Sequence, residues 1–217
     1  YRYFGSVIIK ADKDGIIQKN PLDQIETEEK PKANDDAGRV YLTIDEIRKM
    51  AETECEKEVI KRAFMFSCFC GLRISDIRKL KWTDIEQTTD GDVNTHYRLS
   101  TTMQKTQKTI TYQLSNEAVK WLPERGDGEL VFDHLTKKSK LSMVVKDWAK
   151  AAGIEKYVTF HTARHSFATM MLTLGADIYT TSKLLGHSKI QTTEIYAKII
   201  DKKKDEAMGL IDKFFDK

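Results

Sequence analysis

Four short clusters, well separated along the chain, hold the side chains best suited to chemistry. They are Gly71–Asp76 with its arginine, Met103–Lys108 with its lysines, His161–His165 with a second arginine, and Leu184–His187, which Tyr196 follows nine residues after His187. The planar guanidinium fork suits bidentate contact with phosphate oxygens, lysine and histidine can transfer protons, and a tyrosine hydroxyl can act as a nucleophile. Together these side-chain types can bind an anion, transfer protons and attack an electrophile.

The spacing inside two of these clusters predicts local geometry. Asp76 lies three residues after Arg73, and because positions i and i+3 share one face of a helix, we expect the Asp76 carboxylate to hold the Arg73 guanidinium. His161 and His165 are four residues apart, a spacing that could hold a metal ion on one helix face. No glutamate stands at the position that zinc proteases use and no third ligand is obvious, so the sequence predicts no metal site.

The elements that must position these clusters are mainly helical. Thr43 and Glu46 form the pattern of a capping box, which predicts a helix start. The apolar run 59–70 stops at Gly71 and predicts a buried helix, and a short helix should follow over 72–79. Apolar spacing predicts further helices over 115–121, 139–152, 162–174 and 178–185.

Between Lys81 and Leu114 the sequence changes to β-branched and aromatic residues. This stretch is interrupted at Asp90–Asp92 and again over 104–108, so it predicts three strands of a small antiparallel sheet. A hairpin turn at the second interruption would project a lysine away from the sheet. The predicted fold class is therefore mainly α with a small three-stranded antiparallel sheet, an α+β arrangement.

Composition limits the remaining possibilities. The chain has 217 residues and a net charge of +3, which indicates one main domain and only weakly a polyanionic partner. No apolar run approaches the roughly 20 residues needed to span a bilayer. Two of the three cysteines, Cys68 and Cys70, lie in the apolar run, which argues against disulfides and predicts reduced thiols in a cytoplasmic protein.

The chain divides into four segments by residue composition. Residues 1–22 mix apolar and charged positions and end in turn-forming residues, while 23–39 are polar and charge-rich, as is typical of a solvated linker. The main domain is predicted over 40–205. Residues 206–217 carry an apolar helical stripe that either packs on its own domain or docks into a neighbouring protomer.

The clusters follow one another in an order that resembles a known family. The succession of Arg73, Lys105, His161-x-x-Arg164, Leu185-Gly186-His187 and Tyr196 resembles the catalytic domain of the tyrosine recombinase (phage integrase) family, over about residues 40–205. The resemblance implies a site-specific recombinase that integrates or excises a mobile or conjugative element. Residues 1–22 resemble the end of the helical core-binding domain that precedes the catalytic domain in this family.

The resemblance also implies which residues cut the DNA. Arg73 and Arg164 would clamp the scissile phosphate and stabilise its developing charge without a metal. Tyr196 would attack the phosphorus to give a 3′-phosphotyrosyl bond, and because the ordinary pKa of a tyrosine is about 10, it needs activation.

Proton transfer and phosphate contacts are assigned in the same way. His161 would assist proton transfer at the nucleophile, and His187 would hydrogen-bond the phosphate. Lys105 would give a proton to the leaving 5′ oxygen. Lys108, three residues further along the same turn, is its rival for that role.

The implied partner is double-stranded DNA, and no cofactor, metal or membrane is expected. The family implies a homotetramer on paired DNA sites, a monomer without DNA and an accessory directionality factor. Two alternatives stay open: DNA relaxation of the type IB topoisomerase kind, and an inactive DNA-binding module of the same fold. The topoisomerase alternative shares the nucleophile and the arginine clamp, so the chemistry alone does not separate it from a recombinase.

Overall fold

The computed structural model describes residues 2–24, 39–90, 94–135, 138–201 and 208. The chain divides into two compact units, Tyr1–Gly38 and Arg39–Lys217. Most of the predicted linker, and all of the predicted C-terminal helix except Met208, lie outside the described residues. The two units are therefore treated separately, and the limits of the four sequence segments stay predictions.

The first unit contains one long helix. Helix α1 spans Arg2–Lys13, and a short 3-10 turn, η1, follows at Pro21–Gln24. The exposed apolar side chains of this unit include Phe4, Val7, Ile9 and Ile16. A helix here is compatible with the end of a helical core-binding domain, an assignment that stays a prediction.

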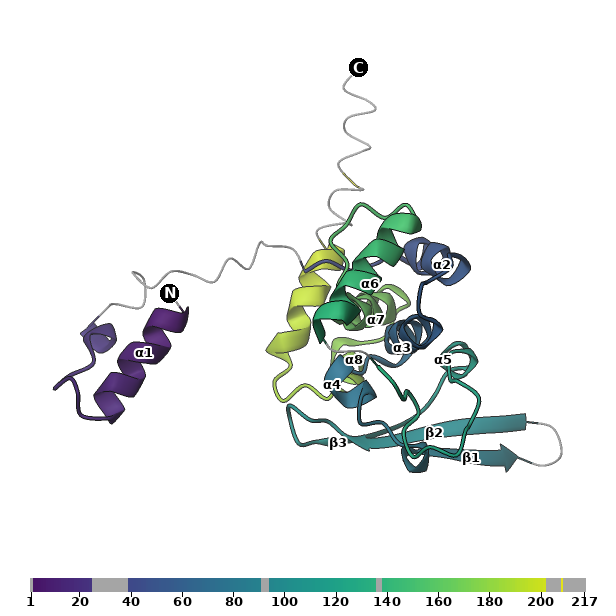
Figure 1. The fold of residues 1–217 in the computed structure, drawn as a ribbon, viewed down its shortest axis with the longest axis horizontal. Helices are drawn as coiled ribbons and strands as arrows, with labels where there is room; N and C mark the ends of the chain where they lie inside the picture. The colour runs from purple at the N-terminus through teal and green to yellow at the C-terminus, as the bar shows by residue number, and fades with distance from the viewer. Residues whose placement is uncertain (1, 25–38, 91–93, 136–137, 202–207, 209–217) are drawn as a thin grey trace, which may run out of the picture. The chain divides into compact units, whose positions relative to one another are not determined.

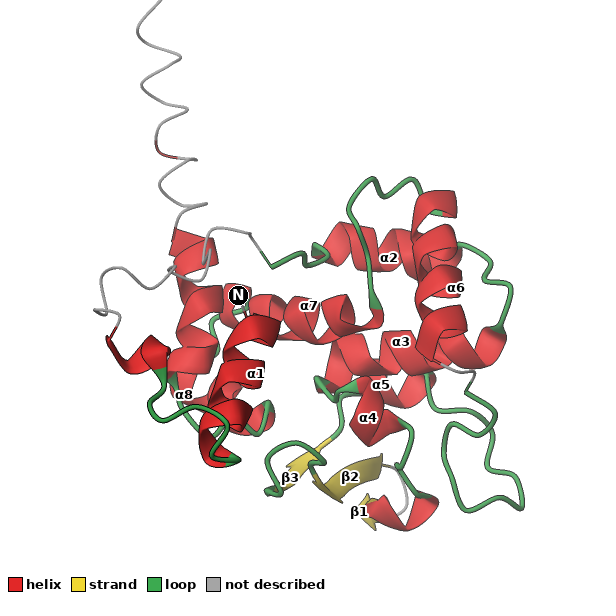
Figure 2. Ribbon diagram, turned by 60° about the vertical axis from the view of Figure 1, so that its left-hand side comes forward, coloured by secondary structure: helices red, strands yellow, loops and turns green. Residues whose placement is uncertain are grey.

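The second unit is mainly helical and carries one small sheet (Figures 1 and 2). Its helices are α2 (Ile44–Glu52), α3 (Glu58–Cys70), α4 (Ile74–Ile77), α5 (Asn116–Lys120), α6 (Lys138–Ala151), α7 (Phe160–Thr173) and α8 (Ile178–Leu184), with the 3-10 turn η2 at Trp82–Asp84. Strands β1 (Ile85–Asp90), β2 (Asn94–Thr102) and β3 (Thr109–Gln113) lie in that order and pair antiparallel. The predicted fold class is confirmed. Within the described ranges, no helix combines the length and the apolar character needed to cross a bilayer.

Residues 191–201 form a further helix, which contains Tyr196. The sequence patterns above do not predict it. Its first turn includes Thr192 and Thr193, and β-branched residues have a lower helix propensity because their χ1 rotation is restricted. The helix makes Tyr196 part of a regular element of the second unit, where its ring is buried in a cluster with Phe167 and Leu185.

Local sequence signals explain how the first helices of this unit begin and end. The Thr43 hydroxyl accepts a hydrogen bond from the Glu46 backbone, and the Glu46 carboxylate accepts one from the Thr43 backbone, so the predicted capping box is confirmed. Helix α3 ends at Gly71, whose φ is +72°. A Cβ there would lie 2.5 Å from the Phe167 ring, so the close approach of this turn to α7 requires glycine.

Helix α3 lies at the centre of the core. Most of its side chains are buried, and Phe64 packs edge-on against Trp148 of α6 and Phe160 of α7, with ring centroids 5.6 Å apart in both pairs. A helix that is apolar on nearly all sides is enclosed by its neighbours. This packing fixes the C-terminal end of α3, and with it Arg73, against α7.

The sheet holds the lysine turn beside the helices. Leu99 at the centre of β2 is buried and pairs with Ile85 of β1 and Tyr112 of β3. The Tyr112 hydroxyl donates to the Cys70 carbonyl at 2.5 Å, which ties β3 to the end of α3. The predicted three-stranded sheet therefore presents its β2–β3 turn next to the residues that follow α3.

Candidate active site

One pocket of about 360 Å³ collects all six residues that the sequence predicts to be catalytic. The residues that line it come from five separate parts of the second unit: the start of the unit, the turn after α3, the β2–β3 turn, α7, and the stretch from the end of α8 through the helix 191–201. They are Arg39, Arg73, Lys105, His161, Arg164, His165, His187, Thr192 and Tyr196. The pocket is therefore strongly cationic and contains one phenol.

Arg164 is the most firmly held of these side chains. It is only 2% exposed, and its two terminal nitrogens donate to the Gly71 carbonyl at 2.7 Å and to the Leu185 carbonyl at 2.5 Å. Burial and the nearby charge of Arg73 lower the pKa of Arg164 to about 10, so the group stays protonated at neutral pH. The fork thus joins α7 to the turns that follow α3 and α8.

Arg73 has a free donor in the same pocket. It precedes α4, and its Nη1 is buried without a hydrogen-bond partner among the described residues. Burial lowers the pKa of this guanidinium, while the negative charge of Asp76 acts in the opposite direction. A buried N–H group that lacks an acceptor is unusual and costly, so this donor is suited to an anionic ligand.

Asp76 does not hold the Arg73 side chain, so the prediction made from the i, i+3 spacing is wrong. Its Oδ2 accepts from the Arg73 backbone N–H at 3.2 Å, and its Oδ1 accepts from the Gln104 backbone N–H at 2.8 Å. At the start of α4 the backbone donors have no partner within the helix, so they compete for a carboxylate in the first turn. Asp76 consequently connects α4 to the β2–β3 turn.

Tyr196 is nearly enclosed, at 2% exposure, and its hydroxyl has two partners. His165 Nδ1 lies 2.7 Å from the hydroxyl oxygen, and Arg39 Nη1 donates to the same oxygen at 3.4 Å. The Arg39 guanidinium also lies 5.7 Å from the centroid of the tyrosine ring. The nucleophile predicted from the sequence therefore stands between a cation and an imidazole.

Sequence reasoning missed both partners of Tyr196. The sequence pattern suggests His165 only as a possible metal ligand beside His161, and it places Arg39 in the predicted linker 23–39. A signal for His165 existed, because it directly follows Arg164 on α7. Arg39 lies 157 residues from Tyr196, and no local pattern marks it.

The other two histidines differ in exposure. His161 is exposed, forms no hydrogen bond with any residue that the structure describes, and lies edge-on to His165 with ring centroids 4.5 Å apart. His187 is buried, and its Nδ1 lies 2.8 Å from the Thr193 hydroxyl. Partial desolvation beside the pocket and the charge of Arg164 lower the pKa of His161, and burial with the same charge lowers the pKa of His187 to about 3. His187 is therefore neutral at physiological pH.

Lys105 lies in the β2–β3 turn and is exposed at the edge of the pocket. The turn is closed by the Gln107 backbone N–H, which donates to the Met103 carbonyl at 2.8 Å, and Gln107 has φ +54°. Lys108 is exposed too, but it does not line the pocket. This placement favours Lys105 as the proton donor, a role that stays a proposal.

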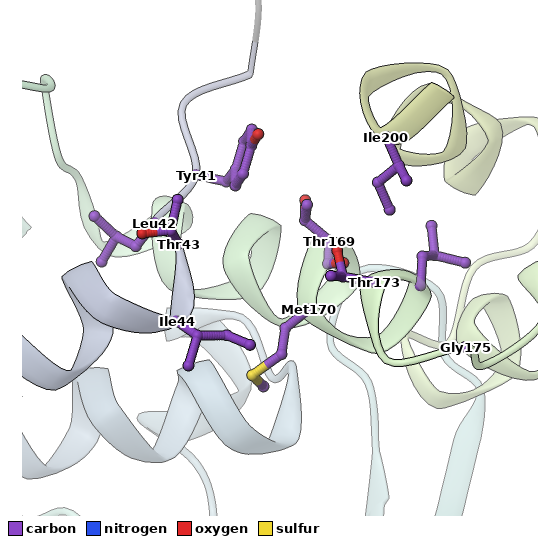
Figure 3. Close-up of a pocket in the computed structure, with 10 residues that line it drawn as sticks. Tyr41, Leu42, Thr43, Ile44, Thr169, Met170, Thr173, Gly175 and Ile200 are labelled. Carbon is purple, nitrogen blue, oxygen red and sulfur yellow. The ribbon is translucent and has the colours of Figure 1, made fainter. Parts of the chain in front are cut away.

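A second, apolar pocket of about 650 Å³ lies in the same unit. Figure 3 shows its walls, which come from the segment before α2, from α7 and from Ile200 near the end of the helix 191–201. Tyr41, Leu42 and Met170 are among its lining residues. Its chemistry differs from that of the cationic pocket, since it offers apolar surface in place of charge.

Comparisons with known proteins identify the family to which this chain is similar. Residues 41–203 match the phage integrase family. The tyrosine recombinase XerD of Listeria innocua is 32% identical over 203 residues, which cover 86% of this chain and 65% of the relative. The tyrosine recombinase XerA of Pyrococcus furiosus is 32% identical over 181 residues, covering 77% of this chain and 60% of the relative. The chain thus spans less than two thirds of the length of these curated relatives.

Solved structures give the same result for the fold. The crystal structure of XerA recombinase matches with a TM-score of 0.58 and 26% sequence identity, covering 81% of this chain and 64% of that chain. The crystal structure of a lambda integrase tetramer bound to a Holliday junction matches with a TM-score of 0.65 and 21% identity, covering 89% of this chain and 56% of that chain. At that identity the second match supports the fold alone.

Proposed function

This chain belongs to the phage integrase family, and we propose that it cleaves and rejoins double-stranded DNA at specific sites with Tyr196 as the nucleophile. The observation that carries the proposal is one pocket that brings this buried phenol together with cationic and imidazole groups from distant parts of the sequence. The residues brought together with Tyr196 include Arg73, Lys105, His161, Arg164 and His187. Double-stranded DNA is the substrate that supplies a phosphodiester for such a pocket.

The two arginines bind and polarise the scissile phosphate. The unpaired Nη1 of Arg73 gains an acceptor in a non-bridging phosphate oxygen. Arg164 is held in place by two carbonyl groups before DNA arrives, so its charge needs little reorganisation during the reaction. Both groups stabilise the negative charge that grows on the phosphate oxygens in the transition state.

The cleavage step transfers the phosphoryl group to the protein. The Tyr196 oxygen forms a bond to phosphorus, the bond from phosphorus to the 5′ oxygen breaks, and Lys105 protonates that oxygen. The product is a 3′-phosphotyrosyl ester with a free 5′-hydroxyl. Because the ester retains the energy of the broken bond, a 5′-hydroxyl can reverse the step and rejoin the DNA without ATP.

A nicked suicide duplex tests this function. Such a duplex, carrying the protein's own recombination site, loses the short 5′-hydroxyl fragment after cleavage, so the covalent protein–DNA adduct accumulates and is visible on a denaturing gel. Tyr196→Phe should bind the duplex and form no adduct. Adduct formation by Tyr196→Phe at the wild-type rate would contradict the proposal, and relaxation of a supercoiled plasmid without any site would instead support a topoisomerase.

The same proposal extends to assembly. We place the chain in a homotetramer on two paired sites, with a monomer in the absence of DNA. Residues 206–217 carry an apolar stripe, and the apolar pocket in Figure 3 is lined by Ile200, just before this segment. The stripe packs against its own domain or docks into a neighbouring protomer. Deletion of 205–217 should abolish pairing of two DNA sites while DNA affinity is kept, if the segment docks between protomers.

The proposed biological setting is the integration or excision of a mobile element in the bacterial cytoplasm. A reduced compartment is supported by the buried free thiols of Cys68 and Cys70. Residues 1–22 belong, in this proposal, to the preceding core-binding domain, joined by the linker 23–39. An accessory directionality factor would select excision over integration. A plasmid with two copies of the site, with and without that factor, tests both directions.

A further inference from the structure

The hydrogen bonds at the Tyr196 oxygen determine where its proton points. Arg39 is a permanent donor, so its N–H occupies a lone pair of the hydroxyl oxygen. The hydroxyl proton is then free for the other neighbour, His165 Nδ1, at 2.7 Å. In the arrangement that also gives the hydroxyl proton an acceptor, His165 accepts at Nδ1 and carries its own proton on Nε2. The geometry thus presents a neutral imidazole with its lone pair on the nucleophile.

His161, the histidine that the family resemblance assigns to this task, is placed differently. It is exposed and makes no hydrogen bond to Tyr196 in the described chain, although it contacts the His165 ring. Its position at the open side of the pocket suits contact with DNA. The direct hydrogen-bond partner of the nucleophile is therefore one helical turn further along α7.

We propose that His165 is a catalytic residue that accepts the Tyr196 proton during cleavage and returns it during rejoining, with Arg39 stabilising the negative charge that develops on the phenolic oxygen in the transition state of each step. This rests on the proposed function above. As the bond from the Tyr196 oxygen to phosphorus forms, the phenol proton passes to His165 Nδ1. The 5′ oxygen leaves with a proton from Lys105, so charge and protons balance.

The groups around His165 suit this cycle. The charged and titratable groups around His165 come from every element that lines the pocket. His161 and Arg164 lie on its own helix, and Arg39 lies at the start of the unit. The others are Arg73 and Lys105, from the turns after α3 and β2, and His187 and Tyr196, from the segments after α8. Burial and the charges of His161 and Arg39 lower the pKa of His165 to about 3, so it is neutral and able to accept a proton. The anionic phosphate raises that pKa when DNA binds, since an opposite charge favours the imidazolium.

Single-turnover adduct formation on the suicide duplex tests the role of His165. His165→Asn keeps an acceptor atom near the position of Nδ1 but cannot take up a proton. We expect cleavage at pH 7 to slow by about 100-fold or more, the usual contribution of a general base. The deficit should shrink at higher pH, as solvent hydroxide ionises a phenol whose ordinary pKa is about 10. His161→Asn should lose less and keep the wild-type pH profile.

Two controls separate this inference from other failures. His134→Asn changes an exposed histidine outside the pocket, so it should cleave at the wild-type rate. The ¹⁵N spectrum of the wild-type imidazoles checks the tautomer without any variant, and it should show His165 neutral and protonated on Nε2. A wild-type rate and pH profile in His165→Asn, or a proton on Nδ1, would overturn the role of His165. An adduct that forms with Tyr196→Phe would overturn the proposed function itself.

Discussion

The helical side of the pocket and the β2–β3 turn that borders it differ in how firmly their side chains are held. Arg164, His165 and His187, which we term the pocket floor, are each hydrogen-bonded and largely enclosed. Lys105, on the turn, is exposed and forms no hydrogen bond with the described residues. In the proposed function the floor is already formed before DNA binds, whereas the Lys105 side chain is positioned only when DNA is present.

The difference matters because the proposed function gives the two regions different tasks. Stabilising charge on a phosphate benefits from donors that do not reorganise during the reaction. Protonating a leaving oxygen needs a group that follows the DNA, and a long flexible side chain on a turn provides this. Changes to the floor should therefore alter stability and chemistry together, and changes to the turn should alter chemistry alone.

The largest expected effect comes from Arg164→Ala. The change leaves the Gly71 and Leu185 carbonyls without a donor and opens a cavity, which should cost about 3 kcal/mol or more in the free energy of unfolding. Cleavage should fall by about 10³-fold or more. Urea unfolding and adduct formation measure the two losses, with Arg164→Lys as the control that keeps charge but not the fork. Wild-type stability in Arg164→Ala would contradict a floor held by this side chain.

Lys105→Ala tests the β2–β3 turn, the more loosely held of the two regions. Cleavage should fall by about 100-fold or more without a change in the urea midpoint, because the side chain is exposed. A duplex with sulfur in place of the leaving 5′ oxygen should restore the rate, since a thiolate leaves without a proton. Lys108→Ala, on the same turn, should cleave normally. Slow cleavage by Lys108→Ala with normal cleavage by Lys105→Ala would identify Lys108 as the proton donor instead.

The sequence predicts the framework of the site better than its contacts. The capping box at Thr43 and the apolar run that ends at Gly71 are local signals, and the structure confirms both elements. Contacts between distant segments have no such signal. The bond between Arg39 and Tyr196 joins residues 157 apart, and Asp76 binds backbone donors that no side-chain pattern reveals. The order of the motifs, through the family resemblance, predicted the six site residues. It did not predict their hydrogen-bond partners.

Acid should weaken the floor through its histidines. The pKa values of His165 and His187 are lowered to about 3, against about 6.5 in the unfolded chain. Below pH 6.5 the unfolded chain takes up protons that the folded chain does not. The free energy of unfolding therefore decreases as the pH is lowered, by at most about 2 kcal/mol per histidine at pH 5. Partial exposure of His165 reduces its share. The wild-type protein should have a lower urea midpoint at pH 5 than at pH 7.5. This difference should be smaller in the double variant His165→Asn/His187→Asn, and a difference as large as in the wild type would contradict the prediction.

Asp76 joins the two regions, so Asp76→Asn should affect both to a small degree. The amide can accept only one of the two hydrogen bonds from the Arg73 and Gln104 backbones, which should cost about 1–3 kcal/mol of stability. A loosened turn should also slow cleavage, by about tenfold for each 1.4 kcal/mol lost at the transition state.

The sulfur-substituted duplex then identifies which region Asp76 acts through. If Asp76 serves the turn, the substituted duplex restores cleavage in Asp76→Asn, because the proton from Lys105 is no longer needed. If it serves Arg73 instead, the rate stays low on both duplexes. Asp84→Asn is the matched control, since Asp84 caps η2 by accepting from the Lys81 backbone and does not bond the lysine turn. We expect a comparable loss of stability there with normal cleavage, because the turn stays attached to α4.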